Sequence, residues 1–203
     1  MAGYAIRGLS KSYNGIPVFQ NVNLEWKEDG IYCLTAPSGA GKTTFLRVLM
    51  GLEKPDAGIS EGLKERRIGA VFQEDRLCLG LDAAANILLT DPVCRGEELR
   101  QELRVLLPQE GLNKPVSEYS GGMRRRVSLL RALLSRGEVL LFDEPFNGLD
   151  TESRRLAIEY VRKKRAGRML LFTTHHEEEA EALGACMLRW DEGKRTWLQE
   201  GRH

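Results

Sequence analysis

A glycine-rich stretch, Ala36 to Thr43, constrains the fold of this chain more than any other sequence feature. The residues before it, 30–35, are short, apolar and partly β-branched, which predicts a buried strand. The residues after it, 42–50, place apolar side chains at helical spacing. A strand, a glycine-rich loop ending in Gly-Lys-Thr and a helix form, in that order, the pattern of a phosphate-binding P-loop. The chain is therefore predicted to build an α/β core around this loop.

The chemistry of this loop assigns roles to its polar groups. Backbone N–H groups from Gly39 to Thr43 can converge on a β-phosphate, and the following helix adds the partial positive charge of its N-terminus. Lys42 supplies a point charge to the β- and γ-phosphates, and the Thr43 hydroxyl can ligate Mg²⁺. Ala36 stands where glycine is more usual, which predicts a negative φ there. The loop residues predicted to bind the nucleotide are Ser38, Gly39, Ala40, Gly41, Lys42, Thr43 and Thr44.

A second phosphate-site signal is the acidic pair that ends an apolar run at Phe142. Asp143 and Glu144 are then expected at the carboxyl end of a buried strand, where α/β sheets bind ligands. We expect Asp143 to hold Mg²⁺, directly or through water. Glu144 is the candidate general base that polarises an attacking water, and losing such a base typically costs about 10²–10⁴ in rate. Lys42 and Glu144 are thus predicted catalytic residues.

Elsewhere, strand patterns alternate with helical patterns and are interrupted by a helical block. The expected strands are 4–13, 21–26, 68–72, 139–142, 168–173, 186–190 and 195–198, with a turn at 54–58. The residues from about 77 to 134 are expected to be helical, ending in a helix capped by Ser120, and two more helices are expected at 151–165 and 177–183. This order predicts a parallel α/β core with an α-helical insertion.

The third signal is the run Tyr119-Ser120-Gly121-Gly122-Met123. Glycines at a helix N-terminus allow backbone amides to approach an anion closely, although the run alone is also compatible with an ordinary capped helix start. In this order and spacing with the other two signals, the sequence resembles the ATP-binding cassette (ABC) ATPase family, whose signature is Leu-Ser-Gly-Gly-Gln. Tyr119 replaces the leucine of that signature, and Met123 replaces its glutamine.

The resemblance covers essentially the whole chain and implies further site residues. Tyr13 matches the aromatic residue that stacks on adenine. Gln73 matches the catalytic Q-loop glutamine, which faces Mg²⁺ and the attacking water. Asp150 ends a run, Asn-Gly-Leu-Asp, that is similar to the D-loop at the nucleotide. His175 matches the catalytic switch histidine at the γ-phosphate, and His176, where aspartate commonly follows, competes for the role.

The same resemblance implies the fold and its subdomains. It implies a P-loop NTPase (RecA-like) core with an antiparallel β subdomain and an inserted α-helical subdomain. A single ABC ATPase domain is expected over 1–203. Its nucleotide-binding core is expected at 1–73 and 137–203, and its helical signature subdomain at 74–136.

The cofactors implied are ATP and Mg²⁺, bound between two copies of the cassette. Cassettes of this family pack head to tail, so that the P-loop of one and the signature of the other enclose ATP. A homodimer is therefore expected, in which Ser120, Gly121 and Gly122 bind the ATP held by the partner. The implied metal-binding residues are Thr43, Gln73 and Asp143.

Composition limits where such an ATPase acts. The formal net charge is +1, so no overall field attracts nucleic acid, and nucleic acid is not an expected partner. No apolar run reaches the roughly 18 residues of a spanning helix. The resemblance implies a cytoplasmic subunit held on the inner face of the cell membrane by a transmembrane permease, with an extracytoplasmic substrate-binding protein as a further partner.

Residues 71–77, with Asn86 and Ile87 following, look similar to bacterial importers of the nitrate, sulfonate and taurine class. The alternatives are the ATPase subunit of an exporter, a non-transport ABC ATPase acting on DNA or ribosomes, and a catalytically silent cassette. The short stretch between Lys42 and Ser120 disfavours the DNA type, which inserts long coiled coils there. An intact Glu144 argues against the silent type.

Overall fold

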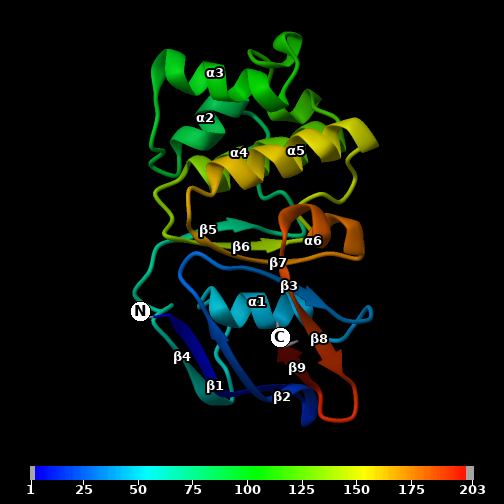
Figure 1. The fold of residues 1–203 in the computed structure, drawn as a ribbon. Coiled ribbons are helices and arrows are strands. Elements are labelled where there is room, and N and C mark those ends of the chain that lie inside the picture. Colours follow the sequence, from blue (N-terminus) through cyan, green and yellow to red (C-terminus); the bar gives the residue numbers. More distant parts are fainter. Residues whose placement is uncertain (1–2, 200–203) are drawn as a thin grey trace.

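Two β-sheets with one helix between them and a helical layer above make up the chain, of which the computed structural model describes residues 3–199 (Figure 1). The smaller sheet is antiparallel and has the order β2-β1-β4. Its strands are β1 (Tyr4–Tyr13), β2 (Ile16–Trp26) and β4 (Ala57–Glu61). This sheet is the antiparallel β part that the resemblance implied.

The larger sheet has the order β5-β6-β7-β3-β8-β9. Its members are β5 (Ile68–Val71), β6 (Val139–Asp143), β7 (Met169–Thr173), β3 (Ile31–Thr35), β8 (Cys186–Asp191) and β9 (Thr196–Gln199). All pairs are parallel except β8 with β9. Every residue of β6 and β7 is buried, as expected for central strands of a sheet covered on both faces.

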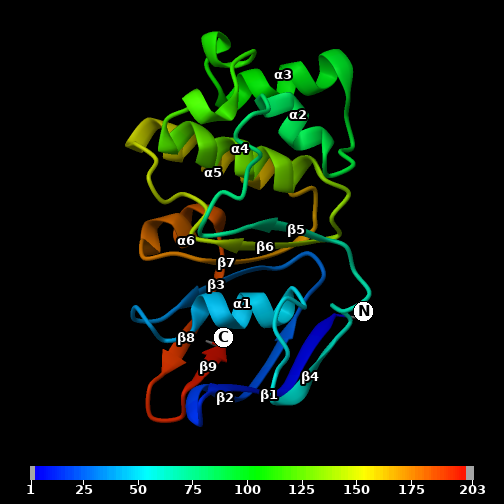
Figure 2. The same cartoon turned by 180° about the vertical axis from the view of Figure 1, so that it is seen from behind.

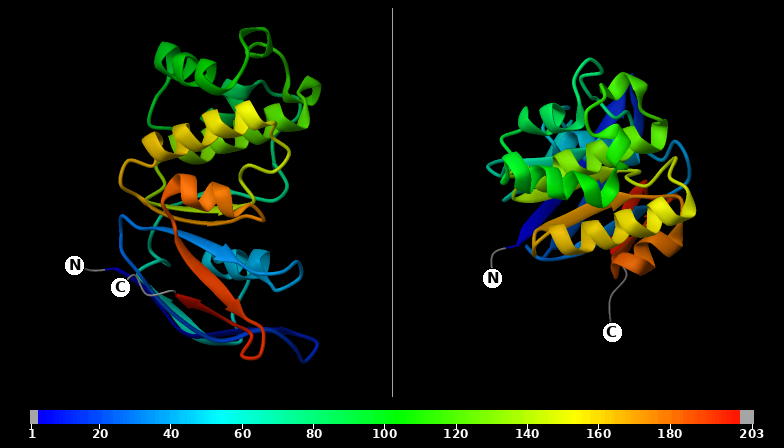
Figure 3. Two further views of the ribbon diagram at one scale, coloured as in Figure 1. Left: turned by 45° about the vertical axis from the view of Figure 1, so that its right-hand side comes forward. Right: turned by 90° about the horizontal axis from the view of Figure 1, so that it is seen from above.

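Six α-helices are seen within residues 3–199. They are α1 (Lys42–Leu49), α2 (Ala83–Leu88), α3 (Gly96–Leu106), α4 (Gly121–Leu134), α5 (Thr151–Lys164) and α6 (Glu177–Leu183). Seen from behind, α1 lies between the two sheets (Figure 2). Its Phe45 and Leu46 share a core with Phe19 of the antiparallel sheet and Leu141 of the parallel sheet. The β8–β9 hairpin runs back beside the antiparallel sheet, where the Gln20 backbone N–H donates to Arg195 O at 2.8 Å (Figure 3).

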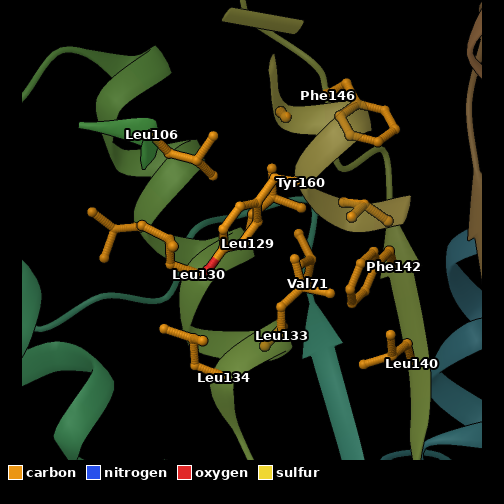
Figure 4. Close-up of a cluster of buried hydrophobic side chains, with 14 of the residues drawn as sticks. Val71, Leu106, Leu129, Leu130, Leu133, Leu134, Leu140, Phe142, Phe146 and Tyr160 are labelled. Carbon is orange, nitrogen blue, oxygen red and sulfur yellow. The ribbon is translucent and has the colours of Figure 1, made fainter. Parts of the chain in front are cut away.

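A second core joins the opposite face of the parallel sheet to the helical layer. In Figure 4, Val71 and Phe142 of the strands point toward Leu129 and Leu133 of α4, with Tyr160 of α5 alongside. Helices α2 and α3 stack on α4, farther from the sheet (Figure 1). The division into a core and a helical subdomain at residues 74 and 136 stays a prediction.

The sequence prediction was wrong at two places in the antiparallel sheet. Residues 54–58 were expected to form only a turn, but β4 begins at Ala57. Its side chains are mostly exposed, so no alternation of buried and polar residues marks it as a strand. Strand β2 begins at Ile16 rather than at residue 21, directly after the Asn14-Gly15 turn. Within residues 3–199, no helix has the length and apolar character needed to cross a membrane.

Candidate functional site

The P-loop connects β3 to α1 through two glycines in the left-handed region, Gly39 with φ 81° and Gly41 with φ 91°. A methyl group added to Gly41 would lie 2.3 Å from Val18 Cγ1, so both conformation and space require glycine there. Ala36 is not among the described residues with positive φ, in agreement with the prediction. The loop thus leads its backbone amides into the N-terminus of α1, where an anion is favoured.

Lys42 is buried at the start of α1, with an exposed fraction of 7%. Its Nζ donates to Ala36 O at 2.7 Å and to Pro37 O at 3.2 Å, so the ammonium group is held against the loop backbone. Burial lowers the pKa of Lys42, while the nearby Glu144 and Asp143 carboxylates favour its charged form. A buried cation beside two acids is the electrostatic setting that attracts a polyphosphate bound with a metal ion.

The two acids lie at the carboxyl end of β6, as the sequence predicted. Asp143 is buried, and its Oδ1 accepts a hydrogen bond from Thr173 Oγ1 at 2.7 Å. Glu144 has φ 48°, which is unusual for a residue with a side chain. One oxygen of its carboxylate, Oε1, lies 2.8 Å from His175 Nε2, and the other accepts from Asn147 Nδ2 at 3.1 Å.

His175 is therefore the histidine that the structure brings to the predicted base. His176 has another place: its backbone N–H donates to Thr174 Oγ1 at 3.0 Å, and the residue occupies the N-cap position of α6 without a side-chain cap hydrogen bond. The two adjacent histidines thus make different contacts.

Thr43, Gln73 and Asp143 line one cavity of about 120 Å³. The three predicted metal-binding residues, which are far apart in the sequence, are thus brought together. They offer a hydroxyl, an amide oxygen and a carboxylate, and Mg²⁺ prefers oxygen ligands of these kinds. The donor set therefore fits a magnesium ion, and Phe72 and Arg76 also line the cavity.

Tyr13 ends β1 with 44% of its surface exposed, so its ring can meet a ligand. Its hydroxyl is hydrogen-bonded to the Glu53 carboxylate, which raises the pKa of Tyr13. The Lys11 ammonium lies 5.0 Å from the centre of the ring. The ring is tethered at its hydroxyl end, which leaves a π-face for stacking.

The signature residues stand apart from this cavity. Ser120 caps α4 by accepting from the Met123 backbone N–H at 3.2 Å, and both Ser120 and Gly121 are exposed. Within residues 3–199, none of Ser120, Gly121 and Gly122 is among the residues lining the cavity. Asp150 likewise serves as a helix cap, because its Oδ1 accepts from the Ser153 backbone N–H of α5 at 2.9 Å.

The two departures from the signature pack around one glycine. The Tyr119 hydroxyl donates to Gly111 O at 2.6 Å, and the Tyr119 side chain is buried. A methyl group on Gly111 would lie 2.8 Å from Met123 Cε and 3.9 Å from Tyr119 Cε1. Both substitutions thus face the interior of the helical layer and leave the Ser-Gly-Gly run at the surface.

Sequence reasoning missed the contact between α4 and the Q-loop. Arg125 donates to Phe72 O and Gln73 O, both at 2.6 Å. Farther along α4, Ser128 Oγ donates to Asp75 O at 3.0 Å, and Arg131 Nη1 donates to Arg76 O at 2.8 Å. The only local signal is that residues 125, 128 and 131 recur every three positions along the helix.

Comparison with known proteins identifies the family of this chain. A family model described as "ABC transporter" matches residues 19–147. The chain belongs to the ABC transporter family. The matched segment contains the P-loop, Gln73, the signature and both acids of the site.

Among curated relatives, sulfate/thiosulfate import ATP-binding proteins CysA recur. The one from Synechocystis is 36% identical over 93% of this chain and 58% of its own length. That from Caulobacter vibrioides is 37% identical over 87% of this chain and 58% of its own. The probable one from Chlorella vulgaris is 36% identical over 93% of this chain and 87% of its own. The chain therefore spans about 58% of the length of the first two relatives. Their names refer to sulfate and thiosulfate rather than to nitrate, sulfonate or taurine.

Solved ABC cassettes share the fold over nearly the full chain. A dimeric post-hydrolysis state of an ATP-binding cassette bound to ADP and Pi matches with a TM-score of 0.82 at 25% identity, covering 98% of this chain and 99% of that one. A dimeric bacterial ABC transporter cassette matches with a TM-score of 0.84 at 25% identity and the same coverage. The predicted fold class is thereby confirmed.

Proposed function

We propose that this chain is the ATP-hydrolysing subunit of an ABC importer. The observation that carries the proposal is the 2.8 Å contact between Glu144 Oε1 and His175 Nε2 beside the cavity that Thr43, Gln73 and Asp143 line. A base, a second polar group and a set of oxygen ligands around a P-loop are the parts needed to hydrolyse a nucleotide triphosphate.

Each part has a role in the proposed reaction. The P-loop amides and Lys42 bind the β- and γ-phosphates and stabilise the charge that develops during hydrolysis. Thr43, Gln73 and Asp143 would hold Mg²⁺, which neutralises phosphate charge when it is bound. Glu144 accepts a proton from the attacking water, and His175 orients the Glu144 carboxylate. Tyr13 stacks on the adenine ring.

The signature is proposed to act in a second copy of the chain. Ser120 and Gly121 are exposed, and a methyl group on Gly122 would lie 3.3 Å from Gly148 O of the D-loop. The signature and the D-loop thus present one continuous surface outside their own cavity. The related solved cassettes are dimers, which supports an ATP-bound homodimer with Asp150 near the shared nucleotide.

A permease is proposed to dock on the far side of the Q-loop. A groove of about 620 Å³ lies there between the edge strand β5 and the end of α4, lined in part by Phe72, Arg76 and Arg131. Leu88 and Leu89, on the neighbouring helix α2 and its end, are 40% and 62% exposed. The proposed partner is a cytoplasmic helix of the permease. Its apolar side chains would pack on the two exposed leucines, and an acidic residue would pair with the arginines of the groove.

The names of the relatives make sulfate and thiosulfate the first cargo to test, with nitrate, sulfonates and taurine as the related alternatives. All are oxyanions or carry an oxyanion group. The chain would then work on the cytoplasmic face of the membrane, through its permease, with an extracytoplasmic substrate-binding protein delivering the anion.

Two variants test the proposed activity. Purified chain is expected to release phosphate from Mg-ATP, Lys42→Ala to lose nucleotide binding, and Glu144→Gln to bind ATP while hydrolysing about 10²–10⁴-fold more slowly. Size-exclusion chromatography with Mg-ATP is expected to show Glu144→Gln as a dimer. Phosphate release by Lys42→Ala equal to wild type, or Glu144→Gln that stays monomeric at all protein concentrations, would contradict the proposal.

A further inference from the structure

One buried hydroxyl contacts both acidic residues of the site. Thr173 is the last residue of β7, has an exposed fraction of 0%, and lies opposite Asp143 in the register of β6 and β7. Its Oγ1 donates to Asp143 Oδ1 at 2.7 Å and accepts from the Glu144 backbone N–H at 2.9 Å. The hydroxyl thus donates its one proton to the Asp143 side chain and accepts a hydrogen bond from the Glu144 backbone.

The contact with Glu144 matters because the Glu144 backbone is strained. A non-glycine residue with φ near 48° is in a sparsely populated conformation, which persists only where its surroundings hold it. The hydrogen bond from the Glu144 N–H to Thr173 Oγ1 is one such restraint. The left-handed turn directs the Glu144 carboxylate to His175 Nε2 and Asn147 Nδ2.

The contact with Asp143 sets how that carboxylate is used. Thr173 donates to Oδ1, and this hydrogen bond restrains the orientation of the carboxylate in the cavity that Asp143 lines. The other residues of β7 are Met-Leu-Leu-Phe, all buried. Packing at the end of such a strand needs only a β-branched apolar residue, so the hydroxyl has a use beyond filling space.

We infer that Thr173 is a positioning residue for ATP hydrolysis. It holds the Asp143 carboxylate in one orientation toward the metal and holds the Glu144 backbone in the turn that places the base. This inference rests on the proposed function and adds to it a residue that, within residues 3–199, is not among those lining the cavity. A displacement of about 1 Å in a catalytic group can cost about 10²-fold in rate, which makes such positioning measurable.

The test compares Thr173→Val, which keeps the shape and loses the hydroxyl, with Thr173→Ser, which keeps the hydroxyl. Thr173→Val is expected to lower kcat about 10–100-fold and to leave KM for ATP within about twofold, since the P-loop contacts are untouched. Thr173→Ser is expected to retain kcat within about threefold. Thermal melts followed by circular dichroism establish that each variant is folded.

A second readout does not depend on turnover. Electron paramagnetic resonance can measure Mn²⁺ binding to the chain in the presence of ADP. Thr173→Val is expected to raise the Kd for Mn²⁺ about tenfold, and Thr173→Ser to leave it near wild type. If Thr173→Val gives no cooperative melt, Thr173→Ala takes its place in both measurements, because it loses the hydroxyl without crowding the site.

The outcomes separate the inference from the proposed function. Wild-type kcat and wild-type Mn²⁺ affinity in Thr173→Val would overturn the inference, and so would equal losses in Thr173→Ser and Thr173→Val. A wild-type chain that does not hydrolyse ATP would contradict the proposed function, whereas the Mn²⁺ affinities of the variants would still decide whether Thr173 orients Asp143.

Discussion

Replacing Arg125 with methionine is expected to destabilise the chain and to displace Gln73 from the cavity that it lines with Thr43 and Asp143. The Arg125 side chain is 8% exposed, and its Nε lies 3.4 Å from Asp75 Oδ1. Its two terminal nitrogens donate to Phe72 O and Gln73 O, each at 2.6 Å. Methionine keeps the length of the apolar stem and loses all three polar contacts.

The magnitude follows from these contacts. A hydrogen bond to a charged group contributes about 1.5–3 kcal/mol, so the two bonds from the Arg125 guanidinium sum to about 3–6 kcal/mol. Gln73 is exposed, so water can replace the bond to its carbonyl oxygen, and the loss in the free energy of unfolding is expected near about 3 kcal/mol. Small domains are stable by only about 5–15 kcal/mol, so this loss is large.

Urea unfolding followed by circular dichroism measures the loss, and steady-state phosphate release measures its effect on catalysis, expected at about tenfold in kcat. Arg124→Met is the matched control on the same helix, because within residues 3–199 the Arg124 side chain makes one hydrogen bond, to Ser117 O at 3.2 Å. The reasoning is refuted if the two variants have the same urea midpoint and the same kcat.

Three further predictions concern other parts of the site and its support. His175→Ala is expected to lower kcat about 10²-fold, whereas His176→Ala should change kcat less than about twofold. Equal effects of the two variants on kcat would contradict the assignment of the switch role to His175. Burial disfavours the charged form of Glu102, but the hydrogen bonds from Lys164 and Tyr160 and the positive charges of Lys164 and Lys163 together outweigh burial and lower the pKa of Glu102. Because the folded pKa lies below the unfolded value of 4.5, this stabilisation is full above pH 4.5 and is lost as the pH falls through the folded pKa, so Glu102→Gln should flatten the acid limb of stability measured by urea unfolding. Gly41→Ala should abolish nucleotide binding measured by fluorescent ATP analogues, because of its clash and its φ of 91°; wild-type affinity would contradict this.

The parts of the site that were predictable from the sequence are those whose signals are local. The P-loop lies within eight consecutive positions, and Asp143 follows a short apolar run that favours a buried strand. The Ser120 helix cap is equally local. In each case, neighbouring residues carry both the structure and the chemistry, so no long-range contact had to be known.

The features that could not be predicted depend on contacts between distant segments. Strand β4 is held by pairing with β1, and Gly58 lies so close to Gly8 that an added methyl group would be 2.4 Å from its backbone. The hydrogen bonds of Arg125 span 53 and 52 positions, and no pattern in α4 indicates its partners. Thr173 reads as an ordinary strand residue until β6 and β7 are placed side by side.

Tyr119 and Met123 are the two positions at which this chain departs from the family signature. Their packing around Gly111 explains why they can differ together, since each fills space next to the same turn. A change at one position alters the room available to the other, so the two substitutions are expected to be non-additive.

Phe72 and Arg76 line both the candidate nucleotide cavity and the groove behind the Q-loop, with the Arg76 guanidinium carbon 3.9 Å from the centre of the Phe72 ring. Any occupant that moves this pair on one side changes the shape of the space on the other. Two sites joined in this way obey thermodynamic linkage: whatever factor a docked partner applies to nucleotide affinity, the nucleotide must apply to the affinity for that partner. The coupling is therefore the same in both directions, and the order in which the two ligands bind decides which one changes the affinity for the other.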